Sequence, residues 1–213
     1  MPAIEHIPAI RDLKPKTLID VGANKGQFSL VARYLFSQVE IHAFEPLHSQ
    51  LLQYKRVVKG PVIHYSVALG AETAQSIFYV TSRADSSSLL RPDKALQGHL
   101  GVKTVSTTIV AVKRLFEVVD FAKLSRPLVI KIDVQGGELD VLKGVDSGLD
   151  FVDAVYCEVS FKKLYEQQPL ADEIRDYLEC RGFMLKGTYN ETPSSSRTPL
   201  QADFLFVRAP GLV

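Results

Sequence analysis

The sequence predicts an α/β fold built on a doubly wound, mostly parallel sheet. A short apolar run at 17–21 is followed by a glycine turn at 22–26 and then by apolar residues at helical spacing. Strand-like and helix-like runs alternate along most of the chain, which favours parallel strands joined by right-handed crossovers. The chain has 213 residues, 46% hydrophobic and 23% charged, which is enough for one large core.

The predicted elements follow from these runs in chain order. The first part has a strand at 17–21, a helix from Phe28 to Leu35, a strand at 39–44, a helix at 47–58 and a strand at 62–69. Two β-branched runs, at 76–81 and 104–112, flank a polar loop and predict a small β insertion around 74–112. The last part has a helix at 113–121, a strand at 128–134, a helix at 136–142, a strand at 152–159, a helix at 170–181 and a terminal hairpin at 183–189 and 202–207.

No internal repeat divides the chain, so we expect one domain at 17–208, an N-terminal leader at 1–16 and a C-terminal tail at 209–213. The leader has no apolar core of the kind that a secretion signal needs, and the longest uncharged stretch, 60–71, is too short to span a membrane. The net charge of +1 gives no field that attracts nucleic acid. The two cysteines form no CxxC pair. We therefore expect a cytoplasmic protein without a nucleic-acid partner or a membrane span.

The glycine turn favours one kind of nucleotide over another. A dinucleotide fingerprint would need glycine at 24 and 27, where the chain has Asn24 and Gln27. What remains is Asp20 followed by Gly22 and Gly26, where backbone can approach a ligand and a carboxylate can bind a cation or hydroxyls. S-adenosylmethionine has an ammonium, a sulfonium, two ribose hydroxyls and no phosphate. The turn therefore suits S-adenosylmethionine better than NAD.

Glu45 lies at the predicted carboxyl end of the second strand, 25 residues beyond Asp20. A carboxylate at this place can accept hydrogen bonds from both hydroxyls of a ribose. The spacing alone suits NAD and S-adenosylmethionine alike, and a solvated charge before Pro46 is the other interpretation. Together with the glycine turn, Glu45 is expected to bind the ribose.

Three motifs in order resemble a known family. They are Ile19-Asp-Val-Gly-Ala-Asn-Lys-Gly-Gln-Phe-Ser29, Ala43-Phe-Glu-Pro46 and Lys131-Ile-Asp-Val-Gln-Gly-Gly-Glu138. The chain resembles the FkbM-type S-adenosylmethionine-dependent methyltransferases over about 17–208. The resemblance implies a class I methyltransferase (Rossmann-like) fold of seven main strands with the last antiparallel. It also implies S-adenosylmethionine as cofactor, and we expect it to contact Asp20, Gly22, Asn24, Gly26, Phe28, Glu45, Pro46, Ala68, Leu69 and Asp133.

A second constellation supplies candidate catalytic residues. With the strand order 3-2-1-4-5-7-6, the carboxylates of Asp20, Asp133 and Glu158 would surround Lys131, whose buried ammonium needs a partner. We expect Asp133 to act as the general base, with Glu158 and His99 as further candidates. A structural ion pair remains open for the cluster, and a solvated loop for His99. Metal ligation by Asp133, Glu158 and Glu138 is possible in principle, but no metal is expected.

The most specific functional hypothesis is O-methylation of a hydroxyl on a sugar, glycan or small natural product, as the resemblance implies. The partner would be a small-molecule or glycan acceptor, and a homodimer is possible. Two alternatives stay open: a non-enzymatic S-adenosylmethionine-binding interaction module, because fold alone never proves chemistry, and an NAD-dependent oxidoreductase. Asn24 and Gln27 argue against the oxidoreductase.

Overall fold

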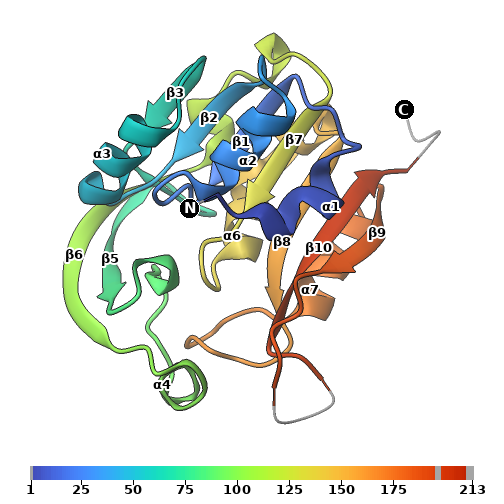
Figure 1. Cartoon of the computed structure of the whole chain (residues 1–213). Helices are drawn as coiled ribbons and strands as arrows, with labels where there is room; N and C mark the ends of the chain where they lie inside the picture. The colour runs from blue at the N-terminus through green and yellow to red at the C-terminus, as the bar shows by residue number, and fades with distance from the viewer. Residues whose placement is uncertain (1, 195–197, 210–213) are drawn as a thin grey trace.

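The computed structural model describes residues 2–194 and 198–209, without the side chain of His99. A seven-stranded sheet has helices on both faces and a smaller three-stranded sheet beside it (Figure 1). The strand order is β3-β2-β1-β7-β8-β10-β9, and β10 runs antiparallel to both of its neighbours. This confirms the predicted sheet order and the antiparallel last strand.

The bounds of the elements are close to those that the hydrophobic runs predict. The large sheet has β1 (Thr17–Val21), β2 (Glu40–Phe44), β3 (Val62–Tyr65), β7 (Leu128–Ile132), β8 (Ala154–Ser160), β9 (Phe183–Tyr189) and β10 (Gln201–Arg208). The small sheet has β4 (Ala68–Leu69), β5 (Ala74–Thr81) and β6 (Thr104–Lys113). The α-helices are α1 (Ile7–Ile10), α2 (Gln27–Leu35), α3 (His48–Val57), α4 (Lys94–Leu100), α5 (Leu115–Val118), α6 (Glu138–Val145) and α7 (Ala171–Glu179). Short 3-10 helices lie at Ile4–His6, Ala84–Ser86, Phe121–Lys123 and Asp146–Phe151.

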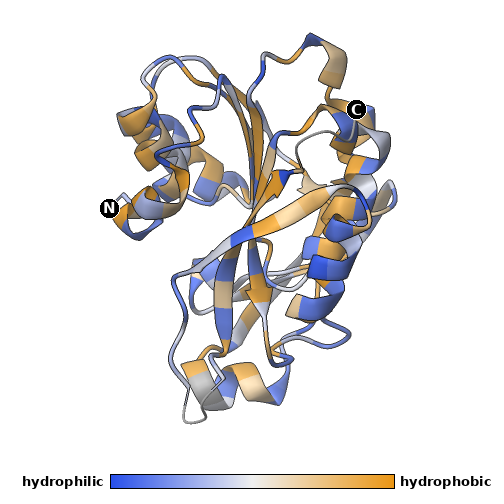
Figure 2. Cartoon of the chain, turned by 90° about the vertical axis from the view of Figure 1, so that its right-hand side faces the viewer, coloured by the Kyte–Doolittle hydropathy of each residue, from blue (hydrophilic) through white to orange (hydrophobic). Residues whose placement is uncertain are grey.

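The central strands are buried because helices cover both of their faces. Alternate residues of β7 point to opposite sides, so Ile130 and Ile132 pack with α5, α6 and α7, while Val129 packs with α1 and α2. Figure 2 shows the apolar strands lying between the two helical layers. Lys131 shares the α1 and α2 side with Val129, and Asp20 is its register partner on β1. A charged pair is thereby built into an apolar layer.

The N-terminal residues pack onto the domain instead of extending away from it. The 3-10 helix Ile4–His6 leads directly into α1, where Ala9 and Ile10 are buried beside α2. The backbone N–H of Ala3 donates to the carbonyl of Gln27. These contacts place the side chain of His6 against the large sheet.

Three predicted segments differ in the structure. The run at 62–69 forms two strands instead of one. Strand β3 ends at Tyr65 in the large sheet, and β4 pairs with β6 in the small sheet. The predicted helix at 113–121 is wrong over most of its length, since Lys113 ends β6 and only four residues, Leu115–Val118, are α-helical. The polar loop of the insertion contains helix α4, whose N-terminus is capped by the Asp93 side chain and whose Leu96 is buried.

Candidate active site

A cavity of about 880 Å³ lies at the carboxyl ends of β1, β2 and β7, where open α/β sheets bind ligands. Its walls come from the N-terminal residues, the glycine turn, the β2–α3 connection, the small sheet and the loop after β7. Eight predicted cofactor-binding residues line it: Gly22, Asn24, Phe28, Glu45, Pro46, Ala68, Leu69 and Asp133. Asp20 and Gly26 are not part of its wall.

The two glycines of the turn serve different purposes. Gly22 has a φ of +73°, and a Cβ there would collide with the carbonyl oxygen of Asp133. Glycine at this place therefore lets the ends of β1 and β7 approach each other at the cavity. Gly26 has a φ of +86°, and a Cβ there would lie 2.6 Å from Val58 Cγ2. Its lack of a side chain lets the turn pack against α3. Contact of Gly26 with the cofactor stays a prediction.

The carboxylate of Glu45 is buried and held at both oxygens. Oε2 accepts from the backbone N–H of Asn24 at 3.0 Å, and Oε1 accepts from the backbone N–H of Leu47 at 2.7 Å. Burial raises the pKa of Glu45 to about 7, although these two hydrogen bonds lower it. The Oδ1 atom of Asn24 is also buried and has no hydrogen-bond partner among the described residues. A fixed acid beside an unpaired acceptor fits a ligand that donates hydrogen bonds, as a ribose does.

This geometry makes cofactor affinity depend on pH. Only ionised Glu45 accepts from two hydroxyls, so affinity for S-adenosylhomocysteine should fall by about tenfold per pH unit below a pKa of about 7 and level off above it. Glu45→Gln should remove this dependence and weaken binding at pH 8 by about 1.5–3 kcal/mol, the cost of losing charge-assisted hydrogen bonds. Isothermal titration between pH 5.5 and 8.5 measures both effects. A wild-type affinity that does not change with pH would show that Glu45 does not bind the ribose.

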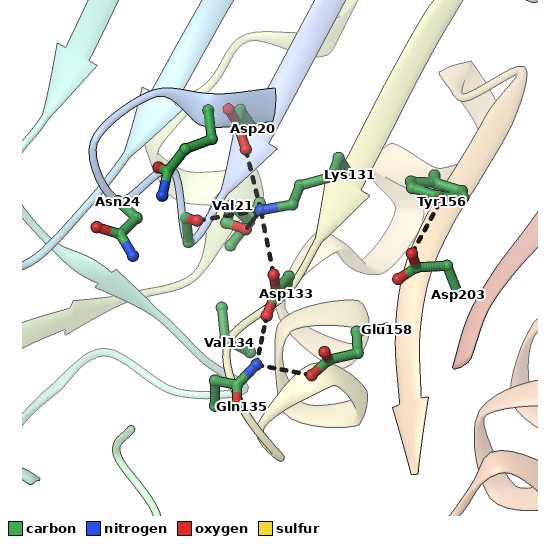
Figure 3. Close-up of polar contacts among 12 residues, drawn as sticks. Asp20, Val21, Asn24, Lys131, Asp133, Val134, Gln135, Tyr156, Glu158 and Asp203 are labelled. Atoms are coloured by element: carbon green, nitrogen blue, oxygen red, sulfur yellow. Dashed lines mark hydrogen bonds and ion pairs between the residues drawn. The ribbon is translucent and has the colours of Figure 1, made fainter. Parts of the chain in front are cut away.

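Lys131 and Asp20 form a buried pair beneath the glycine turn (Figure 3). The Nζ atom of Lys131 lies 3.3 Å from Asp20 Oδ1 and donates to the carbonyls of Val21 and Gly22. Asp20 is fully buried and accepts from Ser29 Oγ at 2.6 Å. Burial by itself lowers the pKa of Lys131, but the attraction of Asp20 and Asp133 raises it above its ordinary value.

The expectation that Asp20 binds the ligand directly needs correction. Its carboxylate is fully buried and does not line the cavity, whereas its register partner Lys131 does. Lys131 itself lines the cavity and holds the carbonyls at the start of the turn. The acid therefore shapes the site through the lysine.

Asp133 points into the cavity from the loop after β7, with a side chain that is 38% exposed. Its Oδ2 lies 3.9 Å from Lys131 Nζ, and its Oδ1 accepts from Gln135 Nε2 at 2.8 Å (Figure 3). Removal from water in the enclosed site raises the pKa of Asp133, although Lys131 and Gln135 lower it. A carboxylate with a raised pKa is a better proton acceptor than an ordinary one.

Glu158 does not join the shell around Lys131 as the sequence suggested. Its Oε2 accepts from Gln135 Nε2 at 2.7 Å and from Gln201 Nε2 at 2.8 Å, so the amide of Gln135 separates it from the cavity. Burial, followed by repulsion from Asp133, raises the pKa of Glu158 well above its ordinary value. Repulsion between the two carboxylates disfavours the state in which both are ionised.

Gln135 is a site residue that the sequence did not reveal. Its backbone adopts a left-handed conformation with a φ of +61°. Its Oε1 accepts from Tyr165 Oη at 3.0 Å, which turns the amide N–H groups toward the two carboxylates. The hydroxyl of Ser88 donates to the carbonyl of Gln135, so the insertion is tied to this loop. The glycines that follow Gln135 were the one available signal of an unusual turn.

His6 is a second residue that sequence reasoning missed. It lines the cavity, and its Nδ1 atom lies 3.3 Å from Asp203 Oδ2. Nothing in the short N-terminal run indicated contact with a strand near the other end of the chain. His99, the predicted third catalytic residue, belongs to α4, and its side chain lies outside the described residues. Its role stays a prediction.

Sequence comparison supports the class that this fold and cavity suggest. The family model described as the methyltransferase FkbM domain matches residues 20–185. Methyltransferase 1 of Beauveria bassiana is 30% identical over 162 residues, which are 68% of this chain and 65% of that protein. Hexuronic acid methyltransferase AglP of Haloferax volcanii is 24% identical over 214 residues, which are 89% of this chain and 84% of that protein. The chain thus spans less than two thirds of the first relative.

Solved structures share the fold at low sequence identity. An rRNA methylase from Streptococcus thermophilus has a TM-score of 0.53 and 9% identity, covering 98% of this chain and 97% of that one. A Streptococcus pneumoniae protein assigned as a tRNA (m1A22) methyltransferase, solved with S-adenosylmethionine, has a TM-score of 0.51 and 12% identity, covering 98% and 74%. These likenesses show the class I methyltransferase fold alone.

The fold is that of a class I methyltransferase, and the chain belongs to the FkbM methyltransferase family, whose model matches residues 20–185. Within residues 2–194 and 198–209, no helix is both long and apolar enough to cross a membrane. Over the same part of the chain, no group of three His, Cys, Asp or Glu side chains is arranged to hold a metal ion.

Proposed function

We propose that this chain transfers a methyl group from S-adenosylmethionine to a hydroxyl of a sugar, glycan or small natural product. One observation carries the proposal: the partly exposed carboxylate of Asp133 faces the same cavity as the predicted cofactor-binding residues and has a raised pKa. An alcohol must lose its proton as it attacks a methyl group, whereas an amine attacks with a free lone pair. A basic carboxylate at this place therefore fits an alcohol acceptor.

Different lining residues would contact the ribose, the adenine and the methionyl part of the cofactor. Glu45 and Asn24 would bind the ribose hydroxyls, and the apolar residues Phe44, Val67 and Leu69 offer a surface for the adenine. The glycine turn and Phe28 would border the methionyl part. When bound, S-adenosylmethionine supplies a methyl group on a positively charged sulfur. Positioning of the acceptor in line with that carbon–sulfur bond supplies much of the rate.

Asp133 would take the proton during the transfer. The acceptor oxygen forms a bond to the methyl carbon, the carbon–sulfur bond breaks with its electrons going to sulfur, and the hydroxyl proton goes to an oxygen of Asp133. Lys131 favours the ionised form of Asp133, because its ammonium lies 3.9 Å away. Gln135 donates to the other carboxylate oxygen and so fixes its direction.

The charge of the wall favours a neutral acceptor. Besides Glu45, the lining acids are Glu5, Glu72, Asp85, Asp133 and Asp140, and no arginine is among the described residues that line the cavity. Lys131 is already committed to Asp20 and the turn carbonyls. The name of the Haloferax relative supports a sugar, but a uronate carboxylate would meet repulsion here. We therefore place neutral sugars ahead of uronic acids as acceptors.

Mass spectrometry tests this function. The purified protein is incubated with S-adenosylmethionine and with matched pairs of neutral and uronic-acid glycosides, together with small hydroxylated metabolites. The expected result is the mass of one added methyl group on a neutral hydroxylated acceptor. The new bond should resist mild base, as a methyl ether does and a methyl ester does not. Transfer to nitrogen or to nucleic acid, or no transfer to any class, would contradict the proposal.

Three further expectations stay predictions: a cytoplasmic location, the absence of a nucleic-acid partner and a homodimer. The large apolar side chains of Ile77, Val105 and Ile109 are exposed on the small sheet, and size measurement in solution addresses the oligomeric state.

A further inference from the structure

A cluster of four polar side chains lies beside the cavity on the α1 and α2 face of the sheet. The Nδ1 atom of His6 is 3.3 Å from Asp203 Oδ2, 2.9 Å from Tyr156 Oη and 3.0 Å from Asn190 Nδ2. Tyr156 Oη and Asn190 Nδ2 also donate to Asp203 Oδ2, at 2.9 and 2.8 Å. Figure 3 shows Asp203 and Tyr156 on neighbouring strands of the sheet. All three of these contacts involve Nδ1 of the imidazole, and Nε2 is not part of the cluster.

The carboxylate of Asp203 is ionised and buried. Burial by itself raises its pKa, but the hydrogen bonds from His6, Asn190 and Tyr156 outweigh burial, and the pKa lies below its ordinary value. A buried anion is costly unless it is paired with a cation. Among the described residues that contact Asp203, His6 is the one that can carry a positive charge. Beside Asp203, a cationic imidazole carries a proton on both Nδ1 and Nε2, so its Nε2–H can donate away from the cluster.

The ring of His6 is fixed toward the cavity. It packs edge-on against Phe28, with 5.3 Å between ring centroids, and against Tyr156, with 5.5 Å. Phe28 in turn has Lys131 Nζ at 5.8 Å from its ring centre. His6, Phe28 and Lys131 all line the cavity next to the glycine turn. The Nε2 atom has one described polar neighbour, the exposed carboxylate of Glu5 at 3.9 Å, which is too far for a hydrogen bond.

The methionyl carboxylate of the cofactor needs a different kind of partner from the ribose hydroxyls. It is an anion, while most charged side chains of the wall are acids. Among the described lining residues, Lys131 and His6 are those that can be cationic, and the hydrogen atoms of Lys131 are engaged by Asp20 and two carbonyls. That leaves His6 Nε2 as the lining donor that can be cationic and that the cluster does not engage. With the ribose on Glu45, the amino-acid end would extend past the glycine turn toward Phe28 and His6.

We propose that His6, held by Asp203, binds the carboxylate of the methionyl group of S-adenosylmethionine through an Nε2–H hydrogen bond. This assigns a ligand-binding role to the N-terminal segment, and it does not depend on the identity of the methyl acceptor. Asp203 is then a positioning residue, since it acts on the cofactor through His6. Tyr156 and Asn190 hold Asp203 in place.

Two ligands that differ only at the amino acid provide the test. S-adenosylhomocysteine contains the methionyl carboxylate, whereas 5′-deoxy-5′-methylthioadenosine keeps the adenine, ribose and thioether but lacks the amino acid. His6→Phe keeps the aromatic volume beside Phe28 and removes both ring nitrogens. In isothermal titration, we expect His6→Phe to lower the affinity for S-adenosylhomocysteine by roughly tenfold or more. Its affinity for methylthioadenosine should stay within about twofold of the wild-type value. His6→Gln should recover part of the affinity, because its amide N–H can donate.

A matched control is His64→Phe, which changes a partly buried histidine that contacts Tyr54 and does not line the cavity. Both ligands should bind His64→Phe as they bind the wild type. If His6→Phe does not fold, nuclear magnetic resonance of the wild-type imidazole nitrogens gives the same answer. Addition of S-adenosylhomocysteine should shift the His6 Nε2 signal strongly, and methylthioadenosine should shift it little.

Several results would overturn the proposal. Equal weakening of both ligands would make His6 a general packing residue. An unchanged affinity for S-adenosylhomocysteine together with slow methyl transfer would make it a proton acceptor instead. If the wild type binds methylthioadenosine as tightly as S-adenosylhomocysteine, the carboxylate has no partner and the assignment fails while the proposed function stands. If the wild type binds neither ligand, both fail.

Discussion

Asp133→Asn is expected to lower the rate of methyl transfer by roughly a hundredfold or more, the effect of a lost general base, while affinity for S-adenosylhomocysteine changes little. Asparagine keeps the shape of the side chain but accepts no proton from a hydroxyl. The ribose and adenine contacts involve other residues, so binding of the cofactor product should survive. Single-turnover kinetics and isothermal titration on the same variant measure the two effects separately.

The matched control is Asp140→Asn, which alters another lining carboxylate that is exposed and paired with Lys143. It should transfer methyl groups within about twofold of the wild type, since a solvated surface ion pair contributes little. The competing interpretation is that Asp133 only neutralises Lys131. In that case Asp133→Asn would melt at a much lower temperature, and its folded fraction would turn over at the normal rate.

Lys131→Met is expected to produce the largest loss of stability among single substitutions at the site. It removes the cation that faces fully buried Asp20, and an uncompensated buried charge costs about 3–5 kcal/mol. For a chain of this size, that loss corresponds to a decrease of roughly 6–20 °C in melting temperature. Calorimetry measures it directly. The turn carbonyls of Val21 and Gly22 also lose their donor, so cofactor affinity should decrease.

The double variant Asp20→Asn/Lys131→Met separates charge from packing. Neutralising Asp20 removes the stranded anion, so the double variant should melt well above Lys131→Met alone. Lys143→Met, at an exposed lysine of α6, should change the melting temperature by no more than a few degrees. A Lys131→Met variant as stable as the wild type would contradict the pairing described here.

The sequence predicted the parts of the site that local chemistry determines. Glu45 and the turn at Gly22 were found because strand ends and glycines have recognisable patterns, and parallel strands bring their carboxyl ends together. Asp20 was placed beside Lys131 correctly, but its full burial depends on the register of β1 against β7. A pattern of residue types does not give that register.

The parts that could not be predicted depend on contacts between distant segments. His6 lies in a short helical turn whose amphipathic pattern is too brief to read, and its partner Asp203 belongs to the last strand. Gln135 takes its role from a left-handed backbone and from Tyr165, which the fold brings across from another loop. Helix α4 was missed because its polar composition resembles a loop, and its capping Asp93 was the signal available.

A crystal structure of the protein with S-adenosylhomocysteine would show which residues bind each part of the cofactor product. We expect both ribose hydroxyls on the Glu45 carboxylate, the adenine against Phe44, Val67 and Leu69, and the sulfur facing the side of the cavity that contains Asp133. Binding of the nucleoside elsewhere, or a ribose that turns away from Glu45 within the same cavity, would contradict this expectation.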